Sequence, residues 1–309
     1  MSTEALREAI TSRVRGAGAT PAEVGTPSPD AALVGEGVRA AGGSAVQGIL
    51  FFGSRKTRAR PDPFSAYDLV VAVSRYGPFY ESLRATGKLR RSPRLVSFLN
   101  RLLPPNQISL VVPRTDGEAS RAKCAVVSVD TLTRETSAAR RDHFLIGRLF
   151  QPTEILYAAD AASRERLVDA LTSAHRLTYS WVRPWLPERF DAALYARTLL
   201  KVSFRGEIRP EPEGRSEALF AAQQDYLVTV YAVLLAELAA KGELLSVGTD
   251  TYALAQPVRA TEALRRRAYF TWSLLRATTR WAKYVVTFDD WLEFIVRKAR
   301  RHSGQDIVL

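Results

Sequence analysis

The sequence has few of the residues that form covalent cross-links and transition-metal sites. It has one cysteine, Cys124, and three histidines, His143, His175 and His302, in 309 residues. A single cysteine rules out an internal disulfide, and its position in the apolar run 122–127 favours a small core residue. The histidines lie far apart, without the spacing typical of a zinc site. The composition therefore argues against a disulfide-stabilised fold and a transition-metal enzyme.

Long hydrophobic runs are also lacking. No stretch approaches the roughly 18 to 20 uninterrupted apolar residues that span a bilayer. The start of the chain, with Glu4 and Glu8 around Arg7, does not resemble a signal peptide. Neither a GxSxG elbow nor a Walker loop is found, so the hydrolase and P-loop classes have no support. We expect an intracellular protein that meets a membrane from one side only, if at all.

Acidic residues are fewer than basic ones. There are 44 Lys and Arg residues against 32 Asp and Glu, which gives a net charge of +12 and a pI near 10.1. This charge predicts an anionic partner, and it fits nucleic acid, a nucleotide or an acidic lipid surface equally well. The 46% hydrophobic and 25% charged residues are typical of a soluble globular protein of one large or two ordinary domains.

One stretch, 46–73, joins two apolar strands through a polar segment rich in Arg and Pro. The first strand ends at Phe52 and is followed by Gly53-Ser54, and Asp68 opens the second. Glycine leaves backbone N–H groups open to a phosphate, and an acid on a neighbouring strand can hold a divalent metal over the same phosphate. This is the plan of a polymerase-beta-type nucleotidyltransferase. The alternatives are an ordinary turn and an ordinary strand cap.

The second strand departs from this plan. Such enzymes usually present two acids at alternate positions, which share one face of the strand. Here Ala66 stands where the first acid would be, and only Asp68 remains. The motif by itself does not separate an enzyme from a non-catalytic relic.

Several cations could neutralise a bound anion. Lys123 interrupts an apolar strand, so it must either meet an anion or be an edge-strand lysine that reaches solvent. In the charged run 201–210, Arg209 could clamp a phosphate and Glu207 could lie near the metal, although such runs are usually solvated loops. Gly147-Arg148 likewise predicts a glycine turn that places an arginine at the edge of the sheet domain, where it could neutralise an anion.

Hydrophobic periodicity predicts an α+β sheet domain followed by helices. Strands are expected at 48–52, 69–73, 107–113 and 121–129. Helices are expected at 3–15, 31–41, 76–87, 92–103, 162–183, 190–201, 216–241 and 260–284, with a hairpin at 243–256. These elements predict an N-terminal helix and linker at 1–30, a nucleotidyltransferase domain at 31–135, a helical, winged-helix-like domain at 136–286 and a C-terminal helix at 287–309.

The chain resembles the phosphatidate cytidylyltransferases of the mitochondrial translocator assembly and maintenance type. The likeness spans about residues 46 to 300 and rests on six blocks in fixed order. These are Phe52-Gly53-Ser54, Asp68-Leu69-Val70, 121–128, Gly147-Arg148-Leu149 with Pro152, 203–209 and 273–298. The family has one Asp in its second strand, as this chain does. It usually has Gly where this chain has Arg55, and Asp where this chain has Glu207.

The resemblance implies transfer of a cytidylyl group from CTP to phosphatidate, giving CDP-diacylglycerol for phospholipid biosynthesis and releasing pyrophosphate. It implies Mg²⁺ as cofactor, with Asp68 and Glu207 as metal ligands. The implied nucleotide-binding residues are Phe52, Gly53, Ser54, Arg55 and Lys123. The implied catalytic residues are Asp68, Lys123, Arg148 and Arg209. Nucleic acid is not an expected partner.

The C-terminal segment predicts how such an enzyme would reach a lipid. Thr287 can cap a helix with Asp289 and Asp290 in its first turn and a basic last turn, the charge order that the helix dipole favours. Its apolar face, which includes Trp291, would lie on the cytoplasmic face of an anionic membrane. The alternative is a terminal helix packed on the second domain.

Two other functions remain open at the level of sequence. The net charge would suit a nucleotidyltransferase that acts on RNA or protein, and the segment Arg280 to Tyr284 combines cations and aromatic rings as single-stranded nucleic-acid sites do. A binding module with a decayed metal site would bind nucleotide weakly and show no metal dependence.

Overall fold

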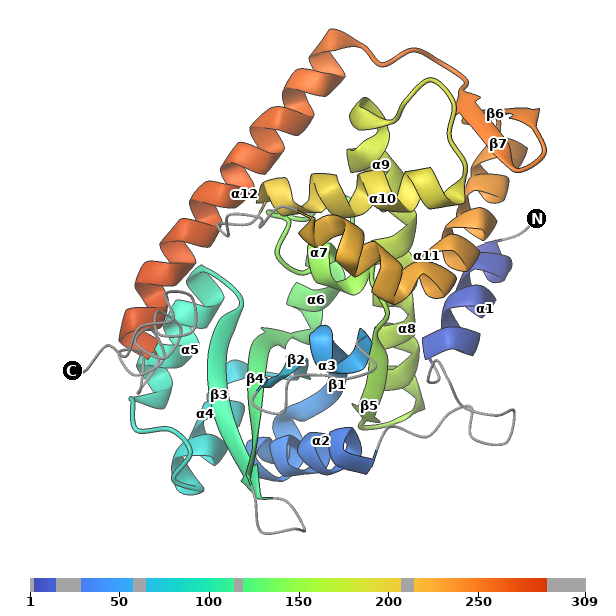
Figure 1. The fold of residues 1–309 in the computed structure, drawn as a ribbon. Helices are drawn as coiled ribbons and strands as arrows, with labels where there is room; N and C mark the ends of the chain where they lie inside the picture. Colours follow the sequence, from blue (N-terminus) through green and yellow to red (C-terminus); the bar gives the residue numbers. More distant parts are fainter. Residues whose placement is uncertain (1–2, 15–28, 58–64, 114–118, 207–213, 288–309) are drawn as a thin grey trace.

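The computed structural model describes residues 3–14, 29–57, 65–113, 119–206 and 214–287 (Figure 1). Its centre is a five-stranded mixed sheet in the order β3-β4-β2-β1-β5. The strands are β1 (Val46–Phe52), β2 (Tyr67–Val73), β3 (Asn106–Pro113), β4 (Ala119–Ser128) and β5 (Glu154–Ala158). β2 and β4 are parallel, and the other neighbours are antiparallel.

The four predicted strands are confirmed, but β5 was not predicted. It is five residues long and pairs with the outer side of β1, with Leu50 opposite Ile155 and Phe51 opposite Glu154. The sheet therefore takes its last strand from beyond residue 135, where the sheet domain was expected to end. Ile155, Leu156 and Tyr157 are adjacent in this strand, so it lacks the alternation of apolar and polar residues that predicts a half-buried strand.

Helices cover both faces of the sheet. One face, with Ile49, Val71 and Cys124, packs against the first group of helices in a shared core cluster. These are α2 (Pro29–Gly42), α4 (Tyr76–Ala85) and α5 (Pro93–Leu102), with the 3-10 turn η1 (Gly43–Ala45) leading into β1. Cys124 is fully buried, which confirms that it is a core residue.

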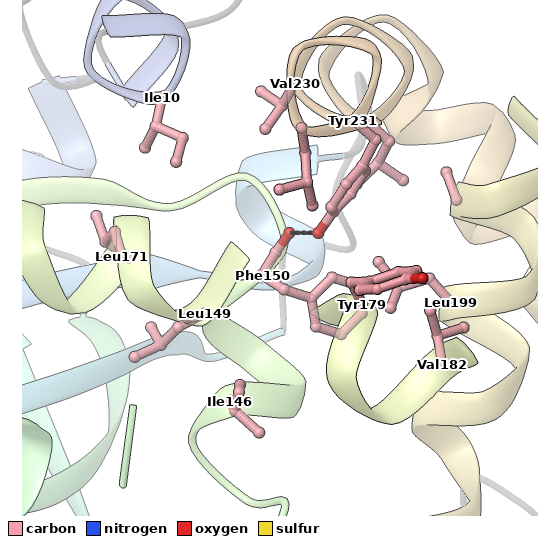
Figure 2. Packing of buried hydrophobic residues seen from close by; sticks show 14 of the residues in the cluster. Ile10, Ile146, Leu149, Phe150, Leu171, Tyr179, Val182, Leu199, Val230 and Tyr231 are labelled. Carbon is pink, nitrogen blue, oxygen red and sulfur yellow. Dashed lines mark hydrogen bonds between the residues drawn. The ribbon is translucent and has the colours of Figure 1, made fainter. Parts of the chain in front are cut away.

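The opposite face, with Leu50 and Val70, joins a larger cluster that continues into the helical half. The helices next to this face are α6 (Val129–Glu135), α7 (Ile146–Leu149) and α8 (Ala161–Arg176). Figure 2 shows part of this cluster, in which the Tyr231 hydroxyl donates a hydrogen bond of 3.1 Å to the Phe150 carbonyl oxygen. Side chains alternate along each strand, so the same strands supply both cores.

The remaining elements complete the helical half and largely match the predicted periodicity. They are α1 (Thr3–Val14), α9 (Thr178–Val182), η2 (Arg183–Trp185), α10 (Ala192–Ser203), η3 (Phe204–Gly206), α11 (Arg215–Ala240), the hairpin of β6 (Leu244–Gly248) and β7 (Thr251–Leu254), and α12 (Ala260–Thr287). The helix expected at 162–183 is interrupted at Leu177, between α8 and α9. The structure is thus mixed α and β, compatible with the α+β class.

α12 runs along one side of the molecule, from the top of the view down to α5 (Figure 1). Its inner side is held by buried cations. Lys283 Nζ donates to the carbonyl oxygens of Leu103 and, at 2.9 Å, Pro105, and Arg280 Nε donates to Pro104 O at 3.1 Å. The helix therefore ties the first half of the chain to the second.

Among the described residues, one helix, α11, is long and apolar enough to cross a membrane by length and composition. Its large apolar residues, such as Tyr226, Val230 and Leu234, are buried in the core beside α1 and α10. Packing inside the protein accounts for its apolar composition.

Candidate functional site

Phe52, Asp68 and Lys123 form one row across three neighbouring strands. Phe52 at the end of β1 lies opposite Asp68 near the start of β2, and Asp68 lies opposite Lys123 of β4. Residues paired in register project to the same side of a sheet, so the three side chains share the face of Leu50 and Val70. All three are half-buried. The register thus brings a carboxylate and an ammonium group together beside the turn that follows β1.

Lys123 is not on an edge strand, because β4 lies between β3 and β2. The alternative of an edge-strand surface lysine is therefore wrong. A cation on a central strand, next to a carboxylate and half-removed from solvent, can lower the energy of an anion placed there more than a fully solvated lysine could.

Gly53 follows this row and packs directly on the carboxylate of Asp68. Its φ is +90°, and a Cβ built there would lie 2.7 Å from Asp68 Oδ2 and 3.2 Å from Asp68 Cβ. A side chain at this position is unfavourable for two reasons: the positive φ strains any residue other than glycine, and a Cβ would contact Asp68 too closely. The predicted pairing of Gly53 with Asp68 across the 46–73 stretch is a physical contact in the folded chain.

A nearly buried ion pair holds the segment after Gly53. This segment, α3 (Ser54–Thr57), turns back so that the Lys56 N–H donates to Gly53 O at 3.0 Å. Lys56 Nζ lies 2.8 Å from Glu154 Oε2 of β5, and the two side chains are 9% and 10% exposed. The ion pair ties the turn beside Asp68 to the edge strand. Sequence reasoning missed it, because nothing local connects residues 98 positions apart.

Arg55 ties the same segment to the start of β2. Its Nε donates to Ser65 O at 2.6 Å, and its guanidinium carbon lies 4.4 Å from the centroid of the Tyr67 ring. Arg55 therefore links the two ends of the polar segment.

Arg148 lies on α7, which covers the same face of the sheet as Asp68 and Lys123. Its Nη1 donates to Phe144 O at 2.6 Å, and its guanidinium carbon lies 3.8 Å from the centroid of the Phe144 ring. The structure brings Phe52, Gly53, Asp68 and Lys123 together, whereas it anchors Arg148 on a separate element above that face.

Two glycines and two serines of the later blocks meet at His143, a residue for which the sequence indicated no site. Cβ atoms at Gly147 and Gly206 would lie 2.8 Å and 2.9 Å from His143 atoms. The Ser203 hydroxyl lies 3.1 Å from His143 Nε2, and the Ser273 hydroxyl accepts a hydrogen bond of 3.0 Å from the His143 N–H. These four small residues are thus explained by close packing around one imidazole.

The environment of His143 keeps it neutral. Burial lowers its pKa to about 3, and the positive charges of Arg140 and Arg148 add to the effect. The ring stacks edge-on against Trp181, with centroids 4.6 Å apart. Since Arg148 directly follows Gly147, this packing sets the position of α7 over the sheet.

The cations of the segment Arg280 to Tyr284 point inward rather than to solvent. Arg280 is 1% exposed and pairs with the buried carboxylate of Asp142, which also accepts from Arg276 Nε at 2.8 Å. Burial alone would raise the pKa of Asp142, but the charge and hydrogen bonds of the arginines outweigh it and lower that pKa. Burial likewise lowers the pKa of Lys283 to about 7. These cations serve to hold α12 in place.

The donor set around Asp68 suits magnesium that arrives with a triphosphate. Within the described parts of the chain, no group of three or more His, Cys, Asp or Glu side chains is close enough to hold a metal ion. Mg²⁺ is commonly bound through one or two carboxylates plus phosphates and water. One carboxylate beside a glycine turn is compatible with that mode, and it does not fit an all-protein metal cage.

Three predicted features lie outside the described residues. They are Glu207, Arg209 and the C-terminal helix expected from residue 287 onward, of which only Thr287 is described, as the end of α12. Comparison of the sequence with models of known protein families and with curated proteins gives no match.

Proposed function

We propose that this protein is a metal-dependent nucleotidyltransferase that transfers the cytidylyl group of CTP to phosphatidate. The observation that carries the proposal is the contact of Gly53 with the Asp68 carboxylate, in register with Lys123 on the next strand. A tight turn, an acid and a cation gathered at one point suit a reaction that brings two anions together. The polymerase-beta-type fold, the winged-helix-like second domain and the substrates are part of this proposal.

In the proposed reaction, a phosphate oxygen of phosphatidate attacks the α-phosphorus of CTP. A new P–O bond forms as the bond from the α-phosphorus to the bridging oxygen of the β-phosphate breaks, and pyrophosphate leaves. Magnesium, when bound, would neutralise the charge that develops on the phosphates. Catalysis then depends on positioning and on charge stabilisation more than on proton transfer.

Positioning and charge stabilisation are proposed for different residues. The turn at Gly53 and Ser54 lets the triphosphate approach the backbone, and Asp68 would hold the metal. Lys123 stabilises the negative charge of the phosphates from the same row of the sheet. The ion pair of Lys56 with Glu154 is a positioning element, because it holds the turn without belonging to that row. Arg148 and Arg209 are proposed to neutralise the remaining phosphate charge.

A lipid substrate requires contact with a membrane, and α5 carries an exposed surface suited to it. Leu95, Phe98 and Leu102 follow one another at spacings of three and four and are 44%, 61% and 64% exposed. Three exposed arginines flank them: Arg91, Arg94 and Arg101. An apolar stripe bordered by cations is typical of helices that lie on anionic lipid. We therefore assign the peripheral, cytoplasmic-face membrane contact to this surface as well as to the C-terminal segment.

The proposed reaction is tested by measuring pyrophosphate release from each of the four nucleoside triphosphates with Mg²⁺, with and without phosphatidate in detergent micelles. We expect release from CTP only when phosphatidate is present, together with CDP-diacylglycerol as product. Release that needs RNA or a protein acceptor instead would select a different nucleotidyltransferase. Nucleotide binding without turnover or metal dependence would select a non-catalytic relative.

The site is tested with Asp68→Asn, which keeps the shape of the side chain and removes its charge. Loss of a key charge-stabilising group costs about 3 to 4 kcal/mol of transition-state stabilisation, so turnover should fall at least about a hundredfold. Asp130→Asn, at an exposed acid of α6, is the matched control. Equal turnover of the two folded variants would contradict the assignment of Asp68.

The membrane surface is tested by co-sedimentation with phosphatidate-containing vesicles. Phe98→Asp should weaken sedimentation, whereas Leu245→Asp, at a 52% exposed leucine of β6, should not. If Phe98→Asp sediments as well as the unchanged protein, the lipid contact lies elsewhere.

A further inference from the structure

A basic hollow of about 440 Å³ lies at the start of α12. Its charged lining consists of Arg183 of η2 and Arg259, Glu262, Arg265 and Arg266 at the beginning of the helix. In Figure 1 this end of α12 lies at the top of the molecule, and the sheet that carries Asp68 lies well below it. The hollow is therefore separate from the site in the sheet.

The positive charge of the hollow is only partly compensated within the described chain. Glu262 Oε2 accepts a hydrogen bond of 2.7 Å from Arg183 Nη1, which neutralises one of the four arginines. Arg259 and Arg265 are exposed and make no side-chain hydrogen bond or ion pair with another described residue. Three guanidinium charges therefore remain to face one hollow.

Two donors of the hollow are also unsatisfied. The Nε–H groups of Arg183 and Arg266 are buried and find no acceptor among the described residues. Buried donors without a partner are costly, so native structures normally satisfy them. Burial is the main cause that lowers the pKa of Arg266, and the nearby positive charge of Arg140 adds to it.

We propose that this hollow binds a ligand with two or more clustered phosphate groups. Guanidinium groups match phosphate oxygens through paired hydrogen bonds, and several of them converge here. The first turn of the 28-residue helix α12 adds positive potential of its own. The volume exceeds that of a single phosphate and falls in the range of small-ligand pockets. The phosphates can come from a soluble polyphosphate or from the surface of a phosphatidate-rich membrane.

The experiment compares a double variant at two arginines of the hollow with a control double variant at two arginines outside it. Arg259→Ala/Arg265→Ala removes two exposed cations, so the fold should persist. Arg164→Ala/Arg267→Ala removes two exposed cations, one on α8 and one on α12, that do not line the hollow. Affinity for inorganic tripolyphosphate is measured by calorimetry on the full chain, and binding to phosphatidate vesicles by co-sedimentation.

We expect Arg259→Ala/Arg265→Ala to lower the affinity for tripolyphosphate about tenfold or more, because each lost hydrogen bond is charge-assisted. The control double variant should change that affinity less than about twofold. If only vesicle binding falls, the phosphates are those of a lipid surface. Equal losses in the two variants, in both assays, would reduce the effect to bulk charge and overturn the proposal. The same titration on Lys123→Ala should retain the binding at the hollow, so failure at either site can be recognised separately.

Discussion

Gly53→Ala would test the central contact of the candidate site. At φ +90° an L-residue is strained by about 1 to 2 kcal/mol. The added Cβ would also lie 2.7 Å from Asp68 Oδ2, too close for an undisturbed contact. Overpacking of this kind costs about 1 to 3 kcal/mol more unless the carboxylate moves. We therefore expect Gly53→Ala to lower the free energy of unfolding by about 2 to 5 kcal/mol, or by less where Asp68 is displaced to relieve the contact.

Gly242→Ala separates the two contributions. Gly242 also has a positive φ, +73°, but nothing lies within 4 Å of the Cβ position. Its substitution should therefore cost only the backbone strain, about 1 to 2 kcal/mol. The difference between the two variants in urea unfolding measures the contact with Asp68. In the pyrophosphate assay, Gly53→Ala should lose most of its turnover and Gly242→Ala should keep it.

A double-mutant cycle makes the test independent of activity. Asp68→Ala removes Oδ2 and leaves only the Asp68 Cβ position, 3.2 Å from the new methyl group. In that background, Gly53→Ala should cost nearly as little as Gly242→Ala. Residues in contact deviate from additivity, whereas independent ones add within about 0.5 kcal/mol. If the cost of Gly53→Ala is the same with and without the Asp68 carboxylate, the reasoning from this contact is refuted.

Three further predictions follow from the surroundings of the site. Lys123→Ala should reduce turnover at least about tenfold, and Lys88→Ala, at an exposed lysine, should not; similar losses would mean that only net charge matters. Glu154→Gln leaves a nearly buried ammonium unpaired, so unfolding stability should fall by about 3 kcal/mol and turnover with it; a change below about 0.5 kcal/mol would show that the pair is dispensable. Burial lowers the pKa of His143 to about 3 and of His175 to about 4, below the ordinary 6.5. The unfolded chain then binds more protons than the folded chain at these pH values, so unfolding stability should fall as the pH drops from 6.5 to 5, by about 1 kcal/mol per pH unit for each histidine. A flat profile in urea unfolding would contradict their buried neutral state.

The hydrophobic pattern alone determined most of the elements. The two strands of the 46–73 stretch follow from continuous apolar runs bounded by turn residues, and the hairpin near Gly248 follows from alternation around a turn. The helical half follows in the same way from spacings of three and four. The pairing of Gly53 with Asp68 was also predictable, because glycine and a strand-opening acid flank a single polar segment.

Only the tertiary structure decided which distant residues meet. Asp68 faces Lys123 because β2 and β4 pair in one register, and a shift by one residue would send them to opposite faces. The pair of Lys56 with Glu154 depends on β5, whose sequence has no alternating pattern by which to recognise it. His143 gathers its small neighbours although its spacing in the sequence indicated no site. Such contacts depend on how whole elements pack, and that packing is a property of the entire core rather than of any local stretch of the sequence.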